Sequence, residues 1–134
     1  MYSALSYVWG DPTATEIVFV NCCPFPVTRN LYEALKAIRG ETNTYTFWTD
    51  AICINQKDDD EKSHQISLMK KIYESATLII AFLGESTKHT DDALEAIKRV
   101  HDFNPRSEFG DSALLGLKDI CNRPYWTRVW IQQE

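Results

Sequence analysis

The chain has 134 residues, of which 44% are hydrophobic and 25% are charged. This length suits one compact domain, and the composition is that of an ordinary globular chain and argues against disorder. The formal net charge of −5 excludes the basic surface that nucleic-acid binding requires. The longest apolar run, residues 76–84, is too short to span a bilayer, and residues 1–10 lack the basic flank of a secretory signal. The sequence therefore predicts a cytoplasmic protein.

The cysteines point to the same compartment. The chain has four of them and no C-x-x-C pair, so we interpret them as reduced thiols. Cys53 stands in an apolar run and is expected to be a buried, unreactive thiol. The three histidines have no spacing that suits zinc, so we expect no metal and no resident cofactor.

The first half of the chain alternates β-rich runs with one helix. Residues 2–9 predict a strand that stops at a Gly-Asp-Pro turn signal. Residues 15–21 form a second β-rich run, which together with residues 22–27 predicts a small hairpin or an edge strand, because Pro24 and Pro26 forbid a long central strand. Thr28 is expected to cap a helix that ends at Gly40.

A strand, a helix and a further strand are expected next. Residues 44–55 predict a strand whose last part, "AICI", is buried. Asp58 and the two aspartates after it suit a helix N-terminus, and an apolar stripe continues the helix to Ala76. Residues 77–84 are short, apolar and bounded by glycine, which is typical of a strand covered on both faces.

Two more helices follow in the prediction. Asp91 or Asp92 opens the first, whose core-facing side chains are expected to be Leu94, Ile97 and Val100. Ser112 is expected to cap the second, over residues 113–121. Pro124 then suits the start of a last helix that stops after about two turns without a terminal cap. We interpret the chain as a fragment that is cut within its domain.

Strands that alternate with helices predict an α/β fold, with a parallel sheet flanked by helices and a small β-hairpin insertion. If the first strand lies between the other two, ligands bind beyond the carboxyl ends of the strands, between the first strand and residues 77–84. The candidate ligand-binding loops are then Trp9-Gly10-Asp11 and the segment after Leu83.

Several residues in these regions have two interpretations. Gly10 would let a ligand approach the backbone and Trp9 would stack on a flat ring, or they simply form a turn and part of the core. Asp50 lies in a largely apolar run and must be hydrogen-bonded, so it either fixes a loop or contacts a ligand. Glu61 and Gln65 share a helix face, which leaves open a polar contact with a neighbouring loop.

Glu134 is the remaining candidate. It stands one helical turn after Trp130, which itself stands one turn after Trp126, so it lies on the aromatic edge of the last helix. A carboxylate beside indole rings is partly desolvated, as acids with chemical roles often are, whereas the alternative is an exposed surface glutamate. The sequence has no dinucleotide-binding glycine pattern, no P-loop and no G-x-S-x-G motif.

Three blocks, in this order, resemble the fungal heterokaryon-incompatibility (HET) domain: "YSALSYVWGD", "WTDAICINQKDDDEKSHQISLMKKIYESATLIIAFLG" and "RPYWTRVWIQQE". The resemblance covers nearly the whole chain, residues 1–134, and implies that the rest of the domain lies beyond Glu134. It also implies a cytosolic effector that triggers cell death in fungal non-self recognition, a form of innate immunity. Companion domains on the same polypeptide would supply the recognition.

HET domains are in turn distantly similar to TIR domains, which have a flavodoxin-like sheet. Some TIR domains hydrolyse NAD with a helical glutamate in a pattern like W-C-x-x-E. The end of this chain resembles that pattern at Trp130 and Glu134, with Ile131 in place of the cysteine.

The resemblance implies that Glu134 is catalytic and that NAD is a substrate, cleaved at its nicotinamide–ribose bond. The other residues implied at the ligand are Tyr7, Trp9, Gly10, Asp11, Asp50 and Trp130. Glu61 and Gln65 are expected to contact these residues and hold them in position. The alternative is a TIR-like module without enzymatic activity that signals by self-association, as a homo-oligomer.

Overall fold

The structure is a computed structural model that describes residues 1–40, 44–102 and 109–128. The chain forms two compact units: the first takes in residues 1–82 and Arg128, and the second takes in residues 83–127. Among the described residues, no helix has the length and the apolar content that crossing a bilayer would require.

The elements of the first unit, in chain order, are β1 (Ser3–Tyr7), β2 (Thr15–Val20), β3 (Cys23–Thr28), α1 (Arg29–Ile38), β4 (Phe47–Trp48), α2 (Asp50–Cys53), α3 (Asp59–Glu74) and β5 (Leu78–Phe82). Those of the second unit are α4 (Lys88–Asp102), α5 (Asp111–Cys121) and a single 3₁₀ turn, Pro124–Thr127.

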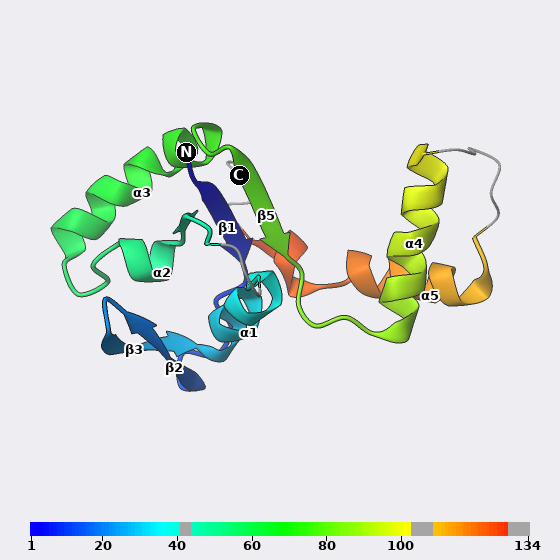
Figure 1. The fold of residues 1–134 in the computed structure, drawn as a ribbon, viewed down its shortest axis with the longest axis horizontal. Helices are drawn as coiled ribbons and strands as arrows, with labels where there is room; N and C mark the ends of the chain where they lie inside the picture. Colours follow the sequence, from blue (N-terminus) through cyan, green and yellow to red (C-terminus); the bar gives the residue numbers. More distant parts are fainter. Residues whose placement is uncertain (41–43, 103–108, 129–134) are drawn as a thin grey trace. The chain divides into compact units, whose positions relative to one another are not determined.

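Three parallel strands form the main sheet of the first unit, in the order β4-β1-β5 (Figure 1). β1 pairs with β5 over its whole length, from Ser3 opposite Leu78 to Tyr7 opposite Phe82. On its other edge β1 pairs with the short β4. The predicted α/β class is confirmed in this respect, and the first strand lies between the other two.

Helices cover both faces of β1 because its side chains alternate between two cores. Leu5 and Tyr7 pack against Leu31 of α1. Ala4, on the opposite face, packs against Tyr73 of α3. Neither face of β1 is left to solvent, so Ser6 is buried together with the apolar residues of the strand.

The two longer helices of this unit, α1 and α3, begin at the predicted caps. The Thr28 hydroxyl accepts a hydrogen bond from the backbone N–H of Leu31 at 3.4 Å. The Asp58 carboxylate accepts hydrogen bonds from the backbone N–H groups of Asp60 and Glu61, at 3.1 and 3.0 Å. The acidic first turn of α3 also complements the positive end of the helix dipole.

The predicted β-hairpin is formed by β2 and β3, which pair in antiparallel fashion from Thr15 opposite Thr28 to Val20 opposite Cys23. The two linking residues, Asn21 and Cys22, have φ angles of 51° and 63°. Two successive left-handed residues form the kind of turn whose twist matches that of the flanking strands. Pro24 and Pro26 are accommodated because this two-stranded sheet has free edges among the described residues.

The strand predicted over residues 44–55 is wrong over most of its length. Only Phe47 and Trp48 pair with β1, and Asp50–Cys53 form the short helix α2 instead. The cause is local, because the Asp50 carboxylate accepts a hydrogen bond from the Ala51 backbone N–H at 2.8 Å and so competes with strand pairing. Cys53 is consequently exposed and not buried as expected, and all four cysteines are unpaired.

β5 is confirmed as a strand, but it is not covered on both faces as predicted. Leu78 and Ile79 are 56% and 38% exposed. β5 pairs with β1 and with no other strand in the described parts of the chain, so its second edge is unpaired there.

In the second unit, α4 begins earlier than predicted. Its first residue is Lys88, because the Thr87 hydroxyl accepts a hydrogen bond from the Thr90 backbone N–H at 3.3 Å and opens the helix ahead of Asp91. The prediction of its inward face is also wrong, since Leu94 and Ile97 are exposed. The side chains buried on α4 are instead the small ones of Ala93 and Thr90.

Ser112 does not cap α5 as predicted, because it lies inside the helix, which begins at Asp111. Its hydroxyl donates to the Asp92 carboxylate of α4 and also hydrogen-bonds the Nδ1 atom of His89. Ser112 therefore joins the two helices of the unit.

α4 and α5 approach each other closely at Gly116. A Cβ atom at Gly116 would lie 1.8 Å from the backbone oxygen of His89 and 2.9 Å from the Cβ of Ala93. Both separations are far below van der Waals contact, so this crossing requires glycine. The buried small residue Ala93 on α4 serves the same close approach.

Gly116→Ala is expected to lower the free energy of unfolding by about 2 kcal/mol, because overpacking outweighs the gain that alanine brings to a helix interior. Gly110→Ala, before the same helix, adds a methyl group that meets nothing within 4 Å and serves as the control. We expect it to change stability by about 0.5 kcal/mol or less. Chemical denaturation followed by circular dichroism measures both, and equal stabilities would contradict the close approach.

Candidate functional site

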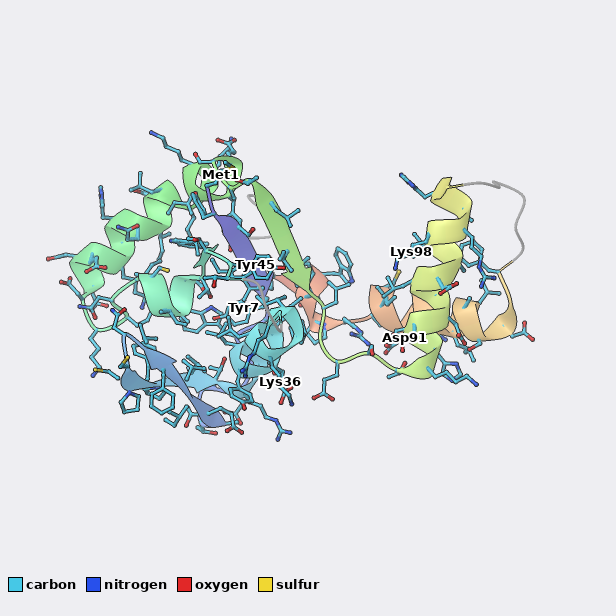
Figure 2. The ribbon with its side chains drawn as sticks, in the orientation of Figure 1. Met1, Tyr7, Lys36, Tyr45, Asp91 and Lys98 are labelled. Atoms are coloured by element: carbon cyan, nitrogen blue, oxygen red, sulfur yellow. The ribbon has the colours of Figure 1, made fainter. Side chains whose placement is uncertain are left out.

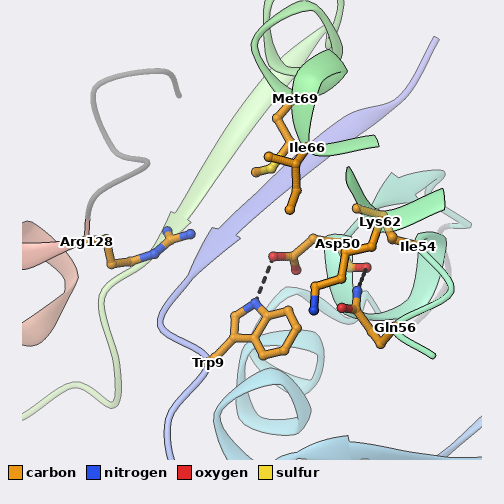
Figure 3. A pocket seen from close by; sticks show the side chains of 8 residues that line it. All are labelled: Trp9, Asp50, Ile54, Gln56, Lys62, Ile66, Met69 and Arg128. Atoms are coloured by element: carbon orange, nitrogen blue, oxygen red, sulfur yellow. Dashed lines mark hydrogen bonds between the residues drawn. The ribbon is translucent and has the colours of Figure 1, made fainter. Parts of the chain in front are cut away.

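A cavity of about 380 Å³ lies beside the carboxyl end of β1 (Figure 3). Its walls come from the loop after β1, from α2 and the loop after it, from α3 and from Arg128. The described residues that line it are Trp9, Asp50, Ile54, Gln56, Lys62, Ile66, Met69 and Arg128. The end of the first strand is where the sequence placed the site. The second predicted ligand-binding loop, directly after Leu83, contributes none of the described lining residues.

Trp9 and Asp50 are joined by a hydrogen bond across the mouth of this cavity. The indole Nε1–H of Trp9 donates to Oδ2 of Asp50 at 2.8 Å, and Oδ1 of Asp50 accepts from the Ala51 backbone N–H. Both carboxylate oxygens are thus engaged, as a carboxylate in a largely apolar setting requires. Asp50 therefore fixes the start of α2, as one interpretation predicted, and it also lines the cavity. Its contact with a ligand stays a prediction.

Gly10 sets the direction of the loop that carries Trp9. Its φ angle is +74°, a left-handed conformation that glycine adopts without strain. Asn30 of α1 packs closely on Gly10, and its side-chain amide donates to the Val8 backbone oxygen at 3.1 Å. Gly10 therefore serves the turn, and no described lining atom of the cavity belongs to it.

Asp11 is also occupied within its own turn. Its Oδ1 atom accepts hydrogen bonds from the hydroxyl and the backbone N–H of Thr13, at 2.7 and 2.8 Å. The Thr13 hydroxyl, and then the Thr13 N–H, lower the pKa of the Asp11 carboxyl below its ordinary value. Asp11 stabilises the loop and is not among the described lining residues.

One face of α3 supplies a third wall. Lys62, Ile66 and Met69 follow each other at spacings of four and three residues, so they lie on one side of the helix. Ile66 and Met69 belong to the apolar stripe that the sequence predicted for this helix, whereas Lys62 was not predicted as a site residue. The signal that could have found it is its position on the same stripe, one turn before Ile66.

Arg128 contributes the fourth wall and was also missed. Its Nη1 atom donates to the hydroxyl of Ser6 at 2.8 Å, and Ser6 is fully buried in β1. The bond joins residues 122 positions apart, so no local pattern in the sequence predicts it.

The charges of the cavity differ from those of the chain. Its described lining has one carboxylate, Asp50, and two cations, Lys62 and Arg128, whereas the whole chain has a net charge of −5. Ile54, Ile66 and Met69 add apolar surface beside the Trp9 ring. Such a site can accept hydroxyl donors at Asp50, hold an anion and pack a flat ring.

Tyr7 lies next to this site without lining it. Its side chain is 1% exposed and packs in the core beside α1 (Figure 2). Burial, and then the Asp50 charge, raise the pKa of Tyr7, so its ionisation at strongly alkaline pH opposes folding. The buried hydroxyls of Tyr7 and Thr49 make no hydrogen bond to the described residues, although Thr49 and Asp50 are close enough to act on Tyr7.

The remaining predicted site residues are not brought to the cavity by the described structure. Glu61 accepts a hydrogen bond from the Asn55 backbone N–H at 3.0 Å and so fixes the loop between α2 and α3. Gln65 is not among the described lining residues. Trp130 and Glu134 lie outside the described residues. Within the parts of the chain that the structure describes, no three metal-ligating side chains come together.

Two buried tyrosines provide a matched test of the orphaned Tyr7 hydroxyl. Tyr73 is 2% exposed and donates to the Leu5 backbone oxygen at 3.2 Å. Tyr73→Phe should therefore lower the free energy of unfolding by about 1 kcal/mol, whereas Tyr7→Phe should leave it unchanged or raise it. Denaturant titration at neutral pH measures both, and a larger loss for Tyr7→Phe would mean that its hydroxyl is hydrogen-bonded.

Comparison with known proteins gives the family. Residues 2–134 match the family described as heterokaryon incompatibility protein (HET). Heterokaryon incompatibility protein 6, OR allele, of Neurospora crassa is 37% identical over 141 residues, which cover 96% of this chain and 19% of that protein. No solved structure matches the chain. The chain spans about a fifth of the length of this relative, and it belongs to the heterokaryon incompatibility (HET) family.

Proposed function

We propose that this chain is the effector domain of a protein of fungal heterokaryon incompatibility, which triggers cell death when genetically unlike cells fuse. Its membership of the HET family and the name of its Neurospora crassa relative support this proposal. That relative is about five times longer than the matched region, which is consistent with companion domains that perform recognition. The effector would act in the cytoplasm.

The proposed chemistry is hydrolysis of NAD at the nicotinamide–ribose bond. The observation that carries it is the cavity at the end of β1, in which Trp9 offers a ring-stacking surface and Asp50 a carboxylate. Lys62 and Arg128 make the same cavity attractive to an anionic ligand. Hydroxyl groups of a ribose are suitable donors to Asp50, and the nicotinamide ring is a suitable partner for Trp9.

In this reaction the bond between ribose C1′ and the nicotinamide nitrogen breaks, and its electron pair leaves with nicotinamide. Positive charge then builds on the ribose, as in glycoside cleavage, until water adds to C1′ and releases a proton. A carboxylate near the ribose stabilises that charge. Glu134 has this role in the proposal because of its spacing from Trp130.

The test uses the full-length parent protein and measures nicotinamide release from NAD. Glu134→Gln should reduce the rate by about 100-fold, since it removes the charge that stabilises the ribose cation. Asp50→Asn should reduce it by about 10-fold, because the amide is a poorer acceptor for ribose hydroxyls. Asp59→Asn, an exposed change in the first turn of α3, is the control and should keep the rate. Unchanged release by Glu134→Gln would remove its catalytic role.

A second candidate function is signalling by self-association without catalysis. It is favoured by the exposed apolar residues Leu78 and Ile79 on β5, whose second edge is unpaired among the described strands. Such an edge can pair with a second copy of the chain. The protein would then form homo-oligomers.

Self-association is tested by sedimentation of the parent protein over a range of concentrations. Ile79→Lys should abolish any oligomer, because a lysine ammonium at a paired edge would be desolvated. Phe19→Lys, on the exposed β-hairpin, serves as the control and should leave the oligomer intact. A wild-type monomer at every concentration would exclude this candidate.

A further inference from the structure

The side-chain amide of Gln56 belongs to the described lining of the cavity beside β1. We infer that Gln56 determines the specificity of this cavity: its carbonyl oxygen accepts a hydrogen bond from an NH₂ group on a flat ring that packs on Trp9. Both rings of NAD carry such a group, nicotinamide in its carboxamide and adenine as its amino group. The inference rests on the proposed function for the identity of the ligand, and it adds the residue that selects the ring.

One hydrogen bond fixes the direction in which the Gln56 amide faces. Its Nε2 atom donates to the backbone oxygen of Asp50 at 2.9 Å. A carbonyl oxygen cannot donate, so the reverse orientation of the amide would set two acceptors against each other. The Oε1 atom therefore faces away from Asp50, and in Figure 3 it points into the cavity on the side of Trp9. No described residue donates a hydrogen bond to it.

The backbone on the N-terminal side of this amide is also held in place. Ile54 is buried, and its N–H donates to the same Asp50 backbone oxygen at 3.1 Å. The Asn55 N–H donates to the Glu61 carboxylate at 3.0 Å. The Gln56 oxygen is therefore presented from a fixed position, as the recognition of a ligand group requires.

Asp50 also fixes the Trp9 ring relative to Gln56. The indole Nε1–H donates to the Asp50 carboxylate at 2.8 Å, whereas Gln56 donates to the backbone oxygen of the same residue. Two groups that are hydrogen-bonded to one residue lie close together, and both line the same cavity. Trp9 is 40% exposed, so its ring keeps surface on which a ligand ring can pack. A ring that packs there brings a substituent at its edge to the Gln56 oxygen.

The chemistry of this oxygen explains why an NH₂ group is selected. A side-chain carbonyl only accepts hydrogen bonds, so an N–H group pairs with it. A methyl group in the same place would displace water from the oxygen and leave it without a donor. Sites that hydrogen-bond a ligand N–H reject an analogue without it more strongly than an apolar pocket rejects a missing methylene.

Two pairs of ligands test the inference, because the members of each pair differ only at the NH₂ group. 3-Acetylpyridine has a methyl group where nicotinamide has its NH₂, and purine lacks the NH₂ of adenine. Ligand-observed NMR with the full-length parent protein measures the four affinities. The ring whose NH₂ meets Gln56 should bind about 10-fold more tightly than its partner. All four ligands are uncharged at neutral pH, so the preference should not depend on salt.

Gln56→Leu keeps the approximate size of the side chain and removes the acceptor. It should weaken binding of the preferred ligand by about 10-fold and leave its partner unchanged, whereas a purely structural role of Gln56 would lower both affinities equally. Asn122→Leu is the matched control, because the Asn122 amide also donates to a backbone oxygen, that of Lys118 at 2.8 Å, but lies outside the described lining. It should bind all four ligands as the wild type does.

Three results would overturn the inference: equal wild-type affinities within both pairs, no binding of any of the four ligands, or equal losses for both members of a pair in Gln56→Leu. The first two need no variant, so they decide the matter even if Gln56→Leu does not fold. A preference in one pair alone identifies which ring of NAD the site takes.

The outcomes also separate this inference from NAD hydrolysis. A Gln56-dependent preference for the NH₂ group in a protein that consumes no NAD would support the inference and contradict the proposed reaction. NAD hydrolysis with an unchanged KM in Gln56→Leu would support the reaction and contradict the inference.

Discussion

The burial of β1 is the constraint on which the first unit depends. Residues 4–7 are at most 1% exposed, so every backbone group in this stretch needs a partner and every side chain needs a packed neighbour. β5 pairs with the whole of one edge, the short β4 pairs with Ser3 and Ala4 on the other, and the Tyr73 hydroxyl donates to the Leu5 backbone oxygen. The helices α1 and α3 cover the two faces. The strand therefore cannot shift by one residue without exchanging its two sets of side chains. Its carboxyl end, from which Trp9 extends, is fixed as a result.

The elements that could be predicted from the sequence are those governed by this burial or by a strong local cap. β5 is a continuous apolar run, β1 combines apolar and β-prone residues before a turn signal, and α1 and α3 begin at side chains that accept backbone hydrogen bonds. The predicted strand over residues 44–55 failed because Asp50 makes a competing bond to the adjacent Ala51. The prediction of the inward face of α4 failed for another reason. The close approach of α4 and α5 requires small residues at their contact, and Leu94 is left exposed.

The residues of the candidate site also divide into those that the sequence could predict and those that it could not. Trp9 and Asp50 could be found because an aromatic residue after a strand and an acid in an apolar run are unusual locally. Lys62 was within reach, since helical spacing places it with Ile66. Arg128 could not be predicted as a site residue, because only the complete fold brings it to its partner Ser6. Residues joined by long-range contacts are beyond any argument from periodicity.

Two buried hydroxyls lie behind the described lining of the cavity. Tyr7 and Thr49 bury hydroxyls that have no partner among the described residues, and both lie next to the residue that faces the cavity, Asp50. A buried hydroxyl without a partner opposes folding, because the loss of its hydration is not compensated.

Electrostatics then decides how an anion would reach such a site. The net charge of −5 repels anions at long range, but at physiological ionic strength this repulsion is screened beyond about 8 Å. Lys62 and Arg128 act inside that distance, within a cavity whose apolar walls strengthen their field. The attraction of an anionic ligand would therefore act at short range and not by long-range steering. The acidic surface would meanwhile discourage large polyanions such as nucleic acids, which carry many phosphates and cannot enter the cavity.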